Sequence, residues 1–350
     1  MNQALNWCRS WYVFYKCLLE KRRREEARRI ALGAYLRLCL DGFFPNKWEL
    51  YQFHQNRREK YVTDQQMLRT AYIDGEQTVL VNDKVIFELA MGKFVRIPHN
   101  FAFFNNGHLI SLDPEINNLS DLKGLLERDK NLIAKPTYGL GGKGIIHLQH
   151  DENGFTSNGR KKNWHQIVTL LLNSGDVIVC EYVRQGVFAN RLYPQTVNTI
   201  RMLSMRDPES GRAFIAAAAF RIGSLRSLPV DNISAGGIVC GIDLVEGRLG
   251  RAATGFFDQG PFRWIDKHPD TGLRLQGLTI PMWKSVCKQI EALADKFPRM
   301  PYVAWDVALG NDDIVVIEGN AWSDVSIFQI NRPLLMDDRI VAFLKHHRII

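Results

Sequence analysis

The pattern of hydrophobic and polar positions changes near residue 131. Before it, stretches rich in good helix formers predict helices over residues 3–40, 47–70, 80–92 and 119–129, the third capped by Asn82 or Asp83. After it, short apolar runs separated by turn residues predict strands, with helices at 164–172, 282–296 and the C-terminus. The predicted strands are residues 131–135, 145–148, 177–181, 199–205, 213–221, 238–244, 248–255, 302–308 and 314–318. Because helices fill the first part and strands dominate the second, the order predicts an α+β fold.

Composition limits the class of protein. The chain has 350 residues, 46% of them hydrophobic, which is enough for a large core and for more than one subdomain. No apolar run approaches the ~20 residues of a membrane-spanning helix, and the N-terminus lacks the basic start of a signal peptide. The six cysteines form no CxxC pair, and the nine histidines form no HExxH motif. We therefore expect buried thiols, no zinc site and a cytoplasmic location.

The net charge of +8 is concentrated at one end of the chain. Residues 1–40 carry nine basic and three acidic side chains, a balance of +6, so only +2 remains for the rest. A nearly neutral body argues against a nucleic-acid partner. Aromatic residues gather at Trp7–Tyr15, just before the basic run at 21–29. The predicted N-terminal helix therefore has two interpretations: an amphipathic helix on a membrane surface or partner, or a helix packed on the domain with a solvated basic face.

A glycine-rich loop gives the strongest chemical signal. Residues 135–144 read KPTYGLGGKG, and glycines let backbone N–H groups approach phosphate oxygens without a Cβ in the way. Gly139, Gly141 and Gly144 satisfy GxGxxG, but a strand rather than a helix follows, which excludes a dinucleotide-binding loop. Lys143 precedes a glycine rather than Ser or Thr, which excludes a Walker A loop. A flap over a triphosphate remains, with Lys135 placed to reach the phosphates; the alternative is an ordinary glycine-rich turn.

Two acidic residues near the C-terminus indicate a metal site. Asp306 lies in the predicted strand 302–308 and Glu318 in the strand 314–318, and a turn centred near residues 311–312 sets them opposite each other. Asn320, two residues further, points to the same face if the strand continues. Oxygen ligands of this kind suit Mg²⁺, which separates carboxylates that would otherwise repel. Both strands are apolar, which disfavours the alternative of an exposed hairpin with scattered charge.

Two weaker signals accompany these. The apolar strand 177–181 ends in Glu181, and such an end can present a carboxylate and backbone groups to an adenine edge, although it can also be a plain strand terminus. Arg201 follows Asn198 on a predicted strand, and Arg221 ends the strand paired with it. Either guanidinium can bind phosphate or carboxylate through two parallel hydrogen bonds, and either can equally form a surface ion pair.

In this order the motifs resemble the ATP-grasp superfamily, and more narrowly the sugar-transfer-associated ATP-grasp family. The residues that carry the resemblance lie between about 41 and 330, and the narrower assignment depends most on NTIR and HPDTG. They are Asp83-Lys84, Ile97-Pro98, KPTYGLGGKG, CEYV, NTIR, WD…IEGN, Val230-Asp231-Asn232, Gly236-Gly237, HPDTG at 268–272, Gly277 and Ile280-Pro281.

The resemblance implies an ATP-grasp fold, in which two α+β subdomains clasp ATP, after an N-terminal helical segment. It implies boundaries at 1–40, a region before the ATP-grasp core at 41–130, a nucleotide-binding subdomain at 131–190 and a metal-binding subdomain at 191–350. It implies ATP contacts from Lys84, Lys135, Gly139, Gly141, Gly142, Lys143, Gly144, Glu181 and Val183, catalytic roles for Arg201 and Lys135, Mg²⁺ ligands Asp306, Glu318 and Asn320, and substrate or phosphate contacts from Asn198, Arg221 and Asn232. One departure is that residues 186–190 hold no carboxylate for the ribose.

The expected reaction is ATP-dependent activation of a carboxylate as an acyl phosphate, followed by attack of an amine. Mg²⁺ and lysines would neutralise charge on the phosphate oxygens, and no protein nucleophile is needed. The resemblance also suggests sugar-linked substrates, polysaccharide biosynthesis and peripheral contact with the inner face of the membrane through residues 1–40. Two alternatives stay open: a phosphotransferase acting on a sugar hydroxyl with the same nucleotide site, and a non-catalytic nucleotide-binding protein.

Overall fold

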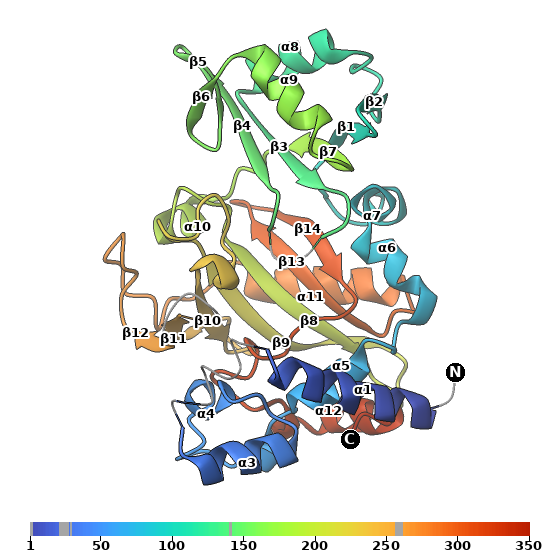
Figure 1. The fold of residues 1–350 in the computed structure, drawn as a ribbon, viewed down its shortest axis with the longest axis vertical. Helices are drawn as coiled ribbons and strands as arrows, with labels where there is room; N and C mark the ends of the chain where they lie inside the picture. The colour runs from blue at the N-terminus through green and yellow to red at the C-terminus, as the bar shows by residue number, and fades with distance from the viewer. Residues whose placement is uncertain (1–2, 21–27, 29, 140–141, 256–261) are drawn as a thin grey trace.

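The computed structural model describes residues 3–20, 28, 30–139, 142–255 and 262–350. Along the long axis of the molecule, an upper lobe sits above a central sheet, and N-terminal helices form the opposite end together with the last helix of the chain (Figure 1). Each lobe contains a seven-stranded sheet whose strands pair antiparallel. The predicted α+β class is confirmed. No helix among the described residues is both long enough and apolar enough to span a membrane.

The upper lobe is a sheet covered by two helices on one face. Its strand order is β2 (His108–Ser111), β1 (Asn100–Asn105), β7 (Val177–Glu181), β3 (Asn131–Pro136), β4 (Ile146–Asp151), β5 (Gly154–Ser157) and β6 (Arg160–Lys162). Helices α8 (Leu119–Asp129) and α9 (Trp164–Leu172) bury leucines and isoleucines against it. Both start at a capping box, from Asn118 and Asn163, which fixes where each helix begins.

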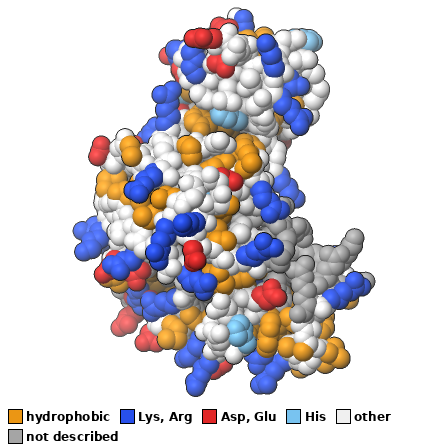
Figure 2. All heavy atoms as spheres, turned by 90° about the vertical axis from the view of Figure 1, so that its left-hand side faces the viewer, with side chains coloured by type: hydrophobic (Ala, Val, Ile, Leu, Met, Phe, Trp, Pro, Cys, Tyr) orange, Lys and Arg blue, Asp and Glu red, His pale blue; other side chains and the backbone are white. Residues whose placement is uncertain are grey.

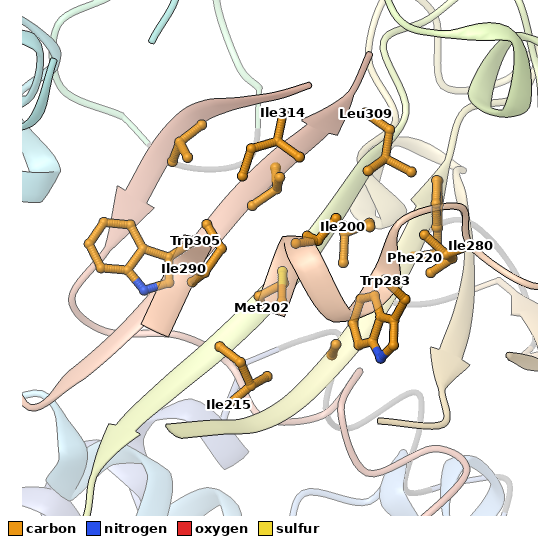
Figure 3. Close-up of a cluster of buried hydrophobic side chains, with 14 of the residues drawn as sticks. Ile200, Met202, Ile215, Phe220, Ile280, Trp283, Ile290, Trp305, Leu309 and Ile314 are labelled. Atoms are coloured by element: carbon orange, nitrogen blue, oxygen red, sulfur yellow. The ribbon is translucent and has the colours of Figure 1, made fainter. Parts of the chain in front are cut away.

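The central sheet joins residues far apart in sequence. Its order is β12 (Arg263–Ile265), β11 (Leu249–Thr254), β10 (Ile238–Ile242), β9 (Ala213–Ile222), β8 (Thr199–Arg206), β13 (Tyr302–Leu309) and β14 (Ile314–Asn320). Helix α11 (Trp283–Asp295) covers one face, where Trp283 and Ile290 pack with Ile200 and Met202 of β8 (Figure 3). Trp305 is fully buried in this core, and its indole N–H donates to Ser204 Oγ at 2.9 Å.

Part of the other face of the central sheet is covered by the two ends of the chain. This second core contains Leu38 and Tyr51 from the N-terminal part, Tyr302 from β13 and Phe343 from the C-terminal helix. The remaining helical elements are α3 (Leu32–Asp41), α4 (Lys47–Leu50), η1 (Arg58–Lys60), α5 (Asp64–Thr70), η2 (Gly75–Thr78), α6 (Val79–Asn82), α7 (Lys84–Met91), α10 (Val187–Leu192), η3 (Ile233–Ala235), η4 (Leu334–Met336) and α12 (Asp338–His346). The segment before residue 64 is therefore part of the folded body.

The prediction of one helix over residues 3–40 was wrong. Helix α1 (Gln3–Leu18) ends in a turn at residues 19–20, and α3 begins only at Leu32; residues 21–27 and 29 lie outside the described part. Phe14 of α1 stacks on Phe44 with ring centroids 5.0 Å apart. In one straight helix, Phe14 would lie about 36 Å from Leu38 at ~1.5 Å per residue. The six residues from Leu38 to Phe44 span at most about 20 Å, so the contact between Phe14 and Phe44 requires the chain to bend before Leu38.

Other sequence predictions had mixed outcomes. The expected elements over 119–129, 164–172 and 177–181 coincide with α8, α9 and β7, and Asp83 caps α7 by accepting from Val85 N and Ile86 N. The predicted helix over 47–70 was wrong, because turns separate α4, η1 and α5 there. The hairpin of β1 and β2 was missed, and it extends the upper sheet beside β7. Cys180 and Cys240 are buried as expected, but Cys8 is exposed.

Candidate active site

A cavity of about 490 Å³ lies between the two sheets. The upper lobe contributes Lys135, His147 and Glu181 to its wall, and the central sheet contributes Arg201 and Asp306. The outline of the molecule narrows between the upper lobe and the body (Figure 2). The cavity therefore occupies the junction at which movement of one lobe would change its width.

The polar floor of the cavity is a row of residues on three adjacent strands. Asp306 on β13 pairs with Arg201 on β8 on one side and with Glu318 on β14 on the other. The predicted opposition of Asp306 and Glu318 is confirmed, although a β-bulge produces it. Val307 pairs with Val316, and the next pair is Asp306 with Glu318, so Ile317 is an extra residue on β14 between the two pairs. Asn320 still belongs to β14 and lines the cavity, as expected.

Asp306 is the most tightly held carboxylate of the row. It is 2% exposed and accepts two hydrogen bonds from Arg201, at 2.7 and 2.8 Å, and one from Arg221 at 2.8 Å. Burial alone would raise the pKa of Asp306, but the two guanidinium groups outweigh it and hold the pKa well below its ordinary value. Burial likewise opposes the charge of Arg201, yet Asp306 and its neighbours raise the pKa of that guanidinium. This cluster stays ionised at neutral pH.

Glu318 is held more loosely. Its carboxylate oxygens lie 3.8 Å from Lys84 Nζ and 4.0 Å from an Arg201 nitrogen. Burial and the neighbouring charge of Asp306 raise the pKa of Glu318, while Lys84 and Arg201 lower it less. Burial also lowers the pKa of Lys84, against the opposing effect of Glu318. A group that brought positive charge to this point would relieve the repulsion between the two carboxylates.

A second group of polar residues in the cavity wall adjoins the row. Asp231 accepts from Thr199 at both the backbone N (2.9 Å) and Oγ (2.6 Å), and Arg221 donates to the same Thr199 Oγ at 2.7 Å. Arg221 thereby links Asp231 with Asp306. Thr199 and Asp231 lie in two of the motifs that carry the family resemblance, NTIR and Val230-Asp231-Asn232, but no role was predicted for either residue. Asn232 does line the cavity, and its side chain caps η3 by accepting from Ser234 N.

The cavity brings together most, but not all, of the residues predicted for nucleotide binding. It is lined by Lys84, Lys135, Gly139, Gly142, Lys143, Glu181, Val183, Arg201, Arg221, Asn232, Asp306, Glu318 and Asn320. Gly144 ends the same loop with φ +77° but is not part of the wall, and Gly141 lies outside the described residues. Glu181 is also engaged already, since Arg96 donates to its carboxylate at 2.7 Å.

Asn198 is not brought to the cavity. It is fully buried, and its amide nitrogen donates to the backbone oxygens of Ala189 and Tyr193 at 3.0 and 2.7 Å. Its amide oxygen accepts from Gly223 N at 2.9 Å. With both ends of the amide engaged by the backbone, Asn198 joins α10 to the start of β8 instead of facing a ligand.

The wall near the upper sheet includes a ring pair that the sequence did not indicate. His147 of β4 stacks on Tyr182 with ring centroids 4.7 Å apart, and both line the cavity. Burial lowers the pKa of His147 to about 4, so the imidazole is neutral at physiological pH. A flat, uncharged wall of this kind suits a planar aromatic ligand.

The donor set at the row fits a magnesium ion that is shared with phosphate oxygens. No group of three His, Cys, Asp or Glu side chains that could hold a metal occurs among the described residues. Mg²⁺ needs fewer, because one or two carboxylates with substrate phosphates suffice. Asp306 and Glu318 would supply the carboxylates. The side-chain nitrogen of Asn320 is buried without a hydrogen-bond partner, and a half-turn of the amide would put its oxygen there.

Comparison with known proteins identifies the family. The family model for sugar-transfer associated ATP-grasp matches residues 64–341. Similar solved structures include N5-carboxyaminoimidazole ribonucleotide synthetase in an ADP complex (12% identity, 75% of this chain and 48% of that one, TM-score 0.40) and the ATP-grasp ligase PsnB with a phosphomimetic variant of minimal precursor, Mg and ADP (12%, 77% and 61%, 0.41). Another is the L-amino acid ligase from Bacillus licheniformis (9%, 73% and 43%, 0.39).

The chain thus spans about half to three fifths of the length of the first two of these proteins. No curated protein sequence matches it. The family match itself covers most of the chain, from α5 to α12, and includes every residue of the row at the cavity floor. The protein is therefore a member of the sugar-transfer associated ATP-grasp family and has the ATP-grasp fold.

Proposed function

We propose that the protein is an ATP- and Mg²⁺-dependent ligase that activates a carboxylate and joins it to an amine. The observation that carries this proposal is the row of Arg201, Asp306 and Glu318 at the floor of one interlobe cavity, with Lys84 and Lys135 beside it. Such a row can hold a divalent cation next to cationic side chains, which is what a transferring phosphoryl group requires. Membership of an ATP-grasp family supports ATP as the phosphoryl donor.

Each side chain then has a defined task. Lys84, Lys135 and Lys143 would bind phosphate oxygens, and the loop around Gly139 and Gly142 would cover them. Arg201, held by Asp306, would direct its remaining N–H groups at the phosphoryl group in transfer. The base would lie toward Glu181 and Val183, against the ring pair of His147 and Tyr182. Asp306, Glu318 and Asn320 would hold Mg²⁺, which supplies positive charge to the phosphate oxygens.

The proposed chemistry has two steps. A substrate carboxylate oxygen bonds to the γ-phosphorus while the bond from that phosphorus to the bridging oxygen of ADP breaks, giving an acyl phosphate and ADP. The amine nitrogen then attacks the acyl carbon, inorganic phosphate leaves with its oxygen, and the nitrogen loses a proton. Neither step needs a covalent bond to the protein.

The substrates that we propose are a small carboxylate and an amine, one of them linked to a sugar, in polysaccharide or related biosynthesis in the cytoplasm. A phosphotransferase is the alternative, since transfer to a sugar hydroxyl would use the same row. Subdomain boundaries at residues 41, 131 and 191 remain our proposal. β1 and β2, which precede residue 131, nevertheless pair with the sheet of the nucleotide-binding part.

The test is to measure ADP release with ATP, Mg²⁺ and panels of carboxylates in the presence of hydroxylamine. A hydroxamate formed in proportion to ADP traps the acyl phosphate and supports the ligase. A stable phosphorylated sugar formed without hydroxamate would show the phosphotransferase instead. If neither product forms and the protein binds no ATP, the proposed function is wrong.

A further inference from the structure

The end of the molecule formed by the N-terminal helices exposes an apolar stripe on α1. Phe14 and Leu18 anchor this helix to the body, on the same side as Ser10, which accepts a hydrogen bond from Gln65 of α5. At ~100° per residue, Cys8, Tyr12 and Tyr15 instead point outward within about 60° of arc. Leu19, in the turn that follows the helix, is also exposed. Tyr12 is 68% exposed. Tyr15 touches the anchored side through ring contacts with Trp11 and Phe14, but the outer side of the stripe is exposed.

Helix α3 carries a matching stripe. Leu32, Leu36 and Leu40 are four residues apart, so they fall on one side of the helix, and all three are exposed, Leu40 to 75%. Leu38 is fully buried on the opposite side. Both helices lie at the lower end of the molecule (Figure 1), and hydrophobic side chains gather at the lower right of the face shown in Figure 2. Several large apolar side chains in one region are more than scattered surface residues require.

Basic residues flank both stripes. Arg9 and Lys16 are exposed and lie roughly 90° around α1 from its apolar stripe, and Arg37 lies beside the leucines of α3. Two copies of the protein that met through this surface would bring like charges together. A nucleic acid would leave the leucines uncovered. A layer with an apolar interior and anionic headgroups matches both features.

We propose that the outer faces of α1 and α3 form a docking surface for an anionic lipid membrane. Leucines would enter the boundary between headgroups and acyl chains, tyrosines would lie among the headgroups, and the cations would bind lipid phosphates. Because Phe14 fixes α1 to the body, docking would hold the central sheet at the membrane. The surface is at the opposite end of that sheet from the upper lobe, which leaves the lobe free to move.

The experiment is sedimentation of the full-length protein with phosphatidylcholine vesicles, with and without about one quarter phosphatidylglycerol. Leu36→Asn combined with Leu40→Asn should weaken binding by roughly tenfold or more, because apolar area no longer leaves water. Arg37→Gln should weaken it by about fivefold, and only on the anionic vesicles. Matched controls are Val245→Asn, at a site that is 76% exposed, and Arg160→Gln in the upper lobe; both should bind like wild type.

Three results would overturn the proposal. One is that wild type at low salt binds anionic vesicles no better than neutral ones. Another is that Val245→Asn loses as much binding as the leucine variant. The third is a dimer in solution that Leu36→Asn dissociates while vesicle binding is absent, which would make a second copy the occupant. ADP release and the midpoint of thermal unfolding should not change in the leucine variant, since Leu36 and Leu40 are exposed and do not line the cavity. The outcome is thus independent of the proposed ligase activity.

Discussion

Neutralising the two carboxylates at the floor of the cavity should have opposite effects on stability and similar effects on turnover. Asp306→Asn removes a buried negative charge that accepts three hydrogen bonds, at 2.7–2.8 Å, from two guanidinium groups. Arg201 then keeps only the longer contact with Glu318 at 4.0 Å, and Arg221 the contact with Asp231 at 3.5 Å. Breaking a buried pair from one side costs about 3–5 kcal/mol, so this variant should be markedly less stable. We had no reason to expect this cost from the sequence.

Glu318→Gln is the cleaner probe of the metal site. Its ion-pair contacts are 3.8 and 4.0 Å long, so an amide of the same shape loses little. The pKa of Glu318 is raised in the folded protein above its ordinary value of 4.5. Its contribution to stability is therefore complete below pH 4.5 and is lost as the pH rises through the folded value. At pH 7 to 8, Glu318→Gln should thus be at least as stable as wild type.

Both variants should lose turnover, because each removes a proposed magnesium ligand. A loss of several kcal/mol of transition-state stabilisation corresponds to a drop on the order of a thousandfold in ADP release. The assay is ADP release at saturating Mg²⁺, alongside denaturant unfolding at pH 5 and pH 8. Near-normal ADP release by Glu318→Gln would refute the assignment of Glu318 as a metal ligand. Wild-type stability of Asp306→Asn would refute the conclusion that Asp306 stabilises the fold by balancing the charges of Arg201 and Arg221.

Three further changes test other parts of the structure. Burial raises the pKa of Asp74 from 3.8 to about 8, so its contribution to the free energy of unfolding is fully present below pH 3.8 and is lost as the pH rises through 8. In Asp74→Asn the midpoint of thermal unfolding should therefore not fall over this pH range. The same fall in the variant as in wild type would contradict this. Gly142→Ala places a Cβ on a residue with φ +70°, 3.2 Å from the side chain of Val230, which strains the glycine-rich loop. The Kd for ATP, measured by calorimetry, should therefore rise roughly fivefold. An unchanged Kd would disprove the role of the loop. Phe14→Ala empties the stack on Phe44 and should cost about 3 kcal/mol in denaturant unfolding, unlike Tyr12→Ser; equal stability of the two would show α1 to be dispensable.

How far the sequence could predict the structure depended on how local the determining interactions are. Helices α8 and α9 carry their own caps at Asn118 and Asn163, so their limits follow from neighbouring residues. The split of the N-terminal segment depends on Phe14 reaching Phe44, a contact made only after the chain has turned back. Propensity alone favours one long helix there, and tertiary packing overrides it.

The candidate site shows the same division. Residue types and spacing indicated most of the side chains that line the cavity, since strand alternation and a glycine-rich loop are local patterns, but His147 and Tyr182 were missed. What each side chain contacts was not predictable. Asn198 and Arg201 lie three residues apart. The side chain of Asn198 forms hydrogen bonds with the backbone at the end of α10, whereas Arg201 lines the cavity. Asn198 is engaged by residues five and nine positions earlier, within and at the end of α10, whereas Arg201 is held by Asp306, 105 positions later. Arg221, which could have been a surface ion pair, is instead the link between Asp306 and Asp231.

The pairing of Asp306 with Glu318 depends on a single extra residue. From the turn, Leu309 pairs with Ile314 and Val307 with Val316, a register that would continue to Asp306 opposite Ile317. Side chains alternate along a strand, so without a shift Glu318 and Asn320 would face the core under α11. The bulge on β14 moves the register by one and returns both to the side of Asp306. The cavity floor therefore depends on an irregularity in an otherwise regular hairpin. Because the bulge brings Glu318 beside Asp306, it also creates the repulsion that a bound cation would relieve.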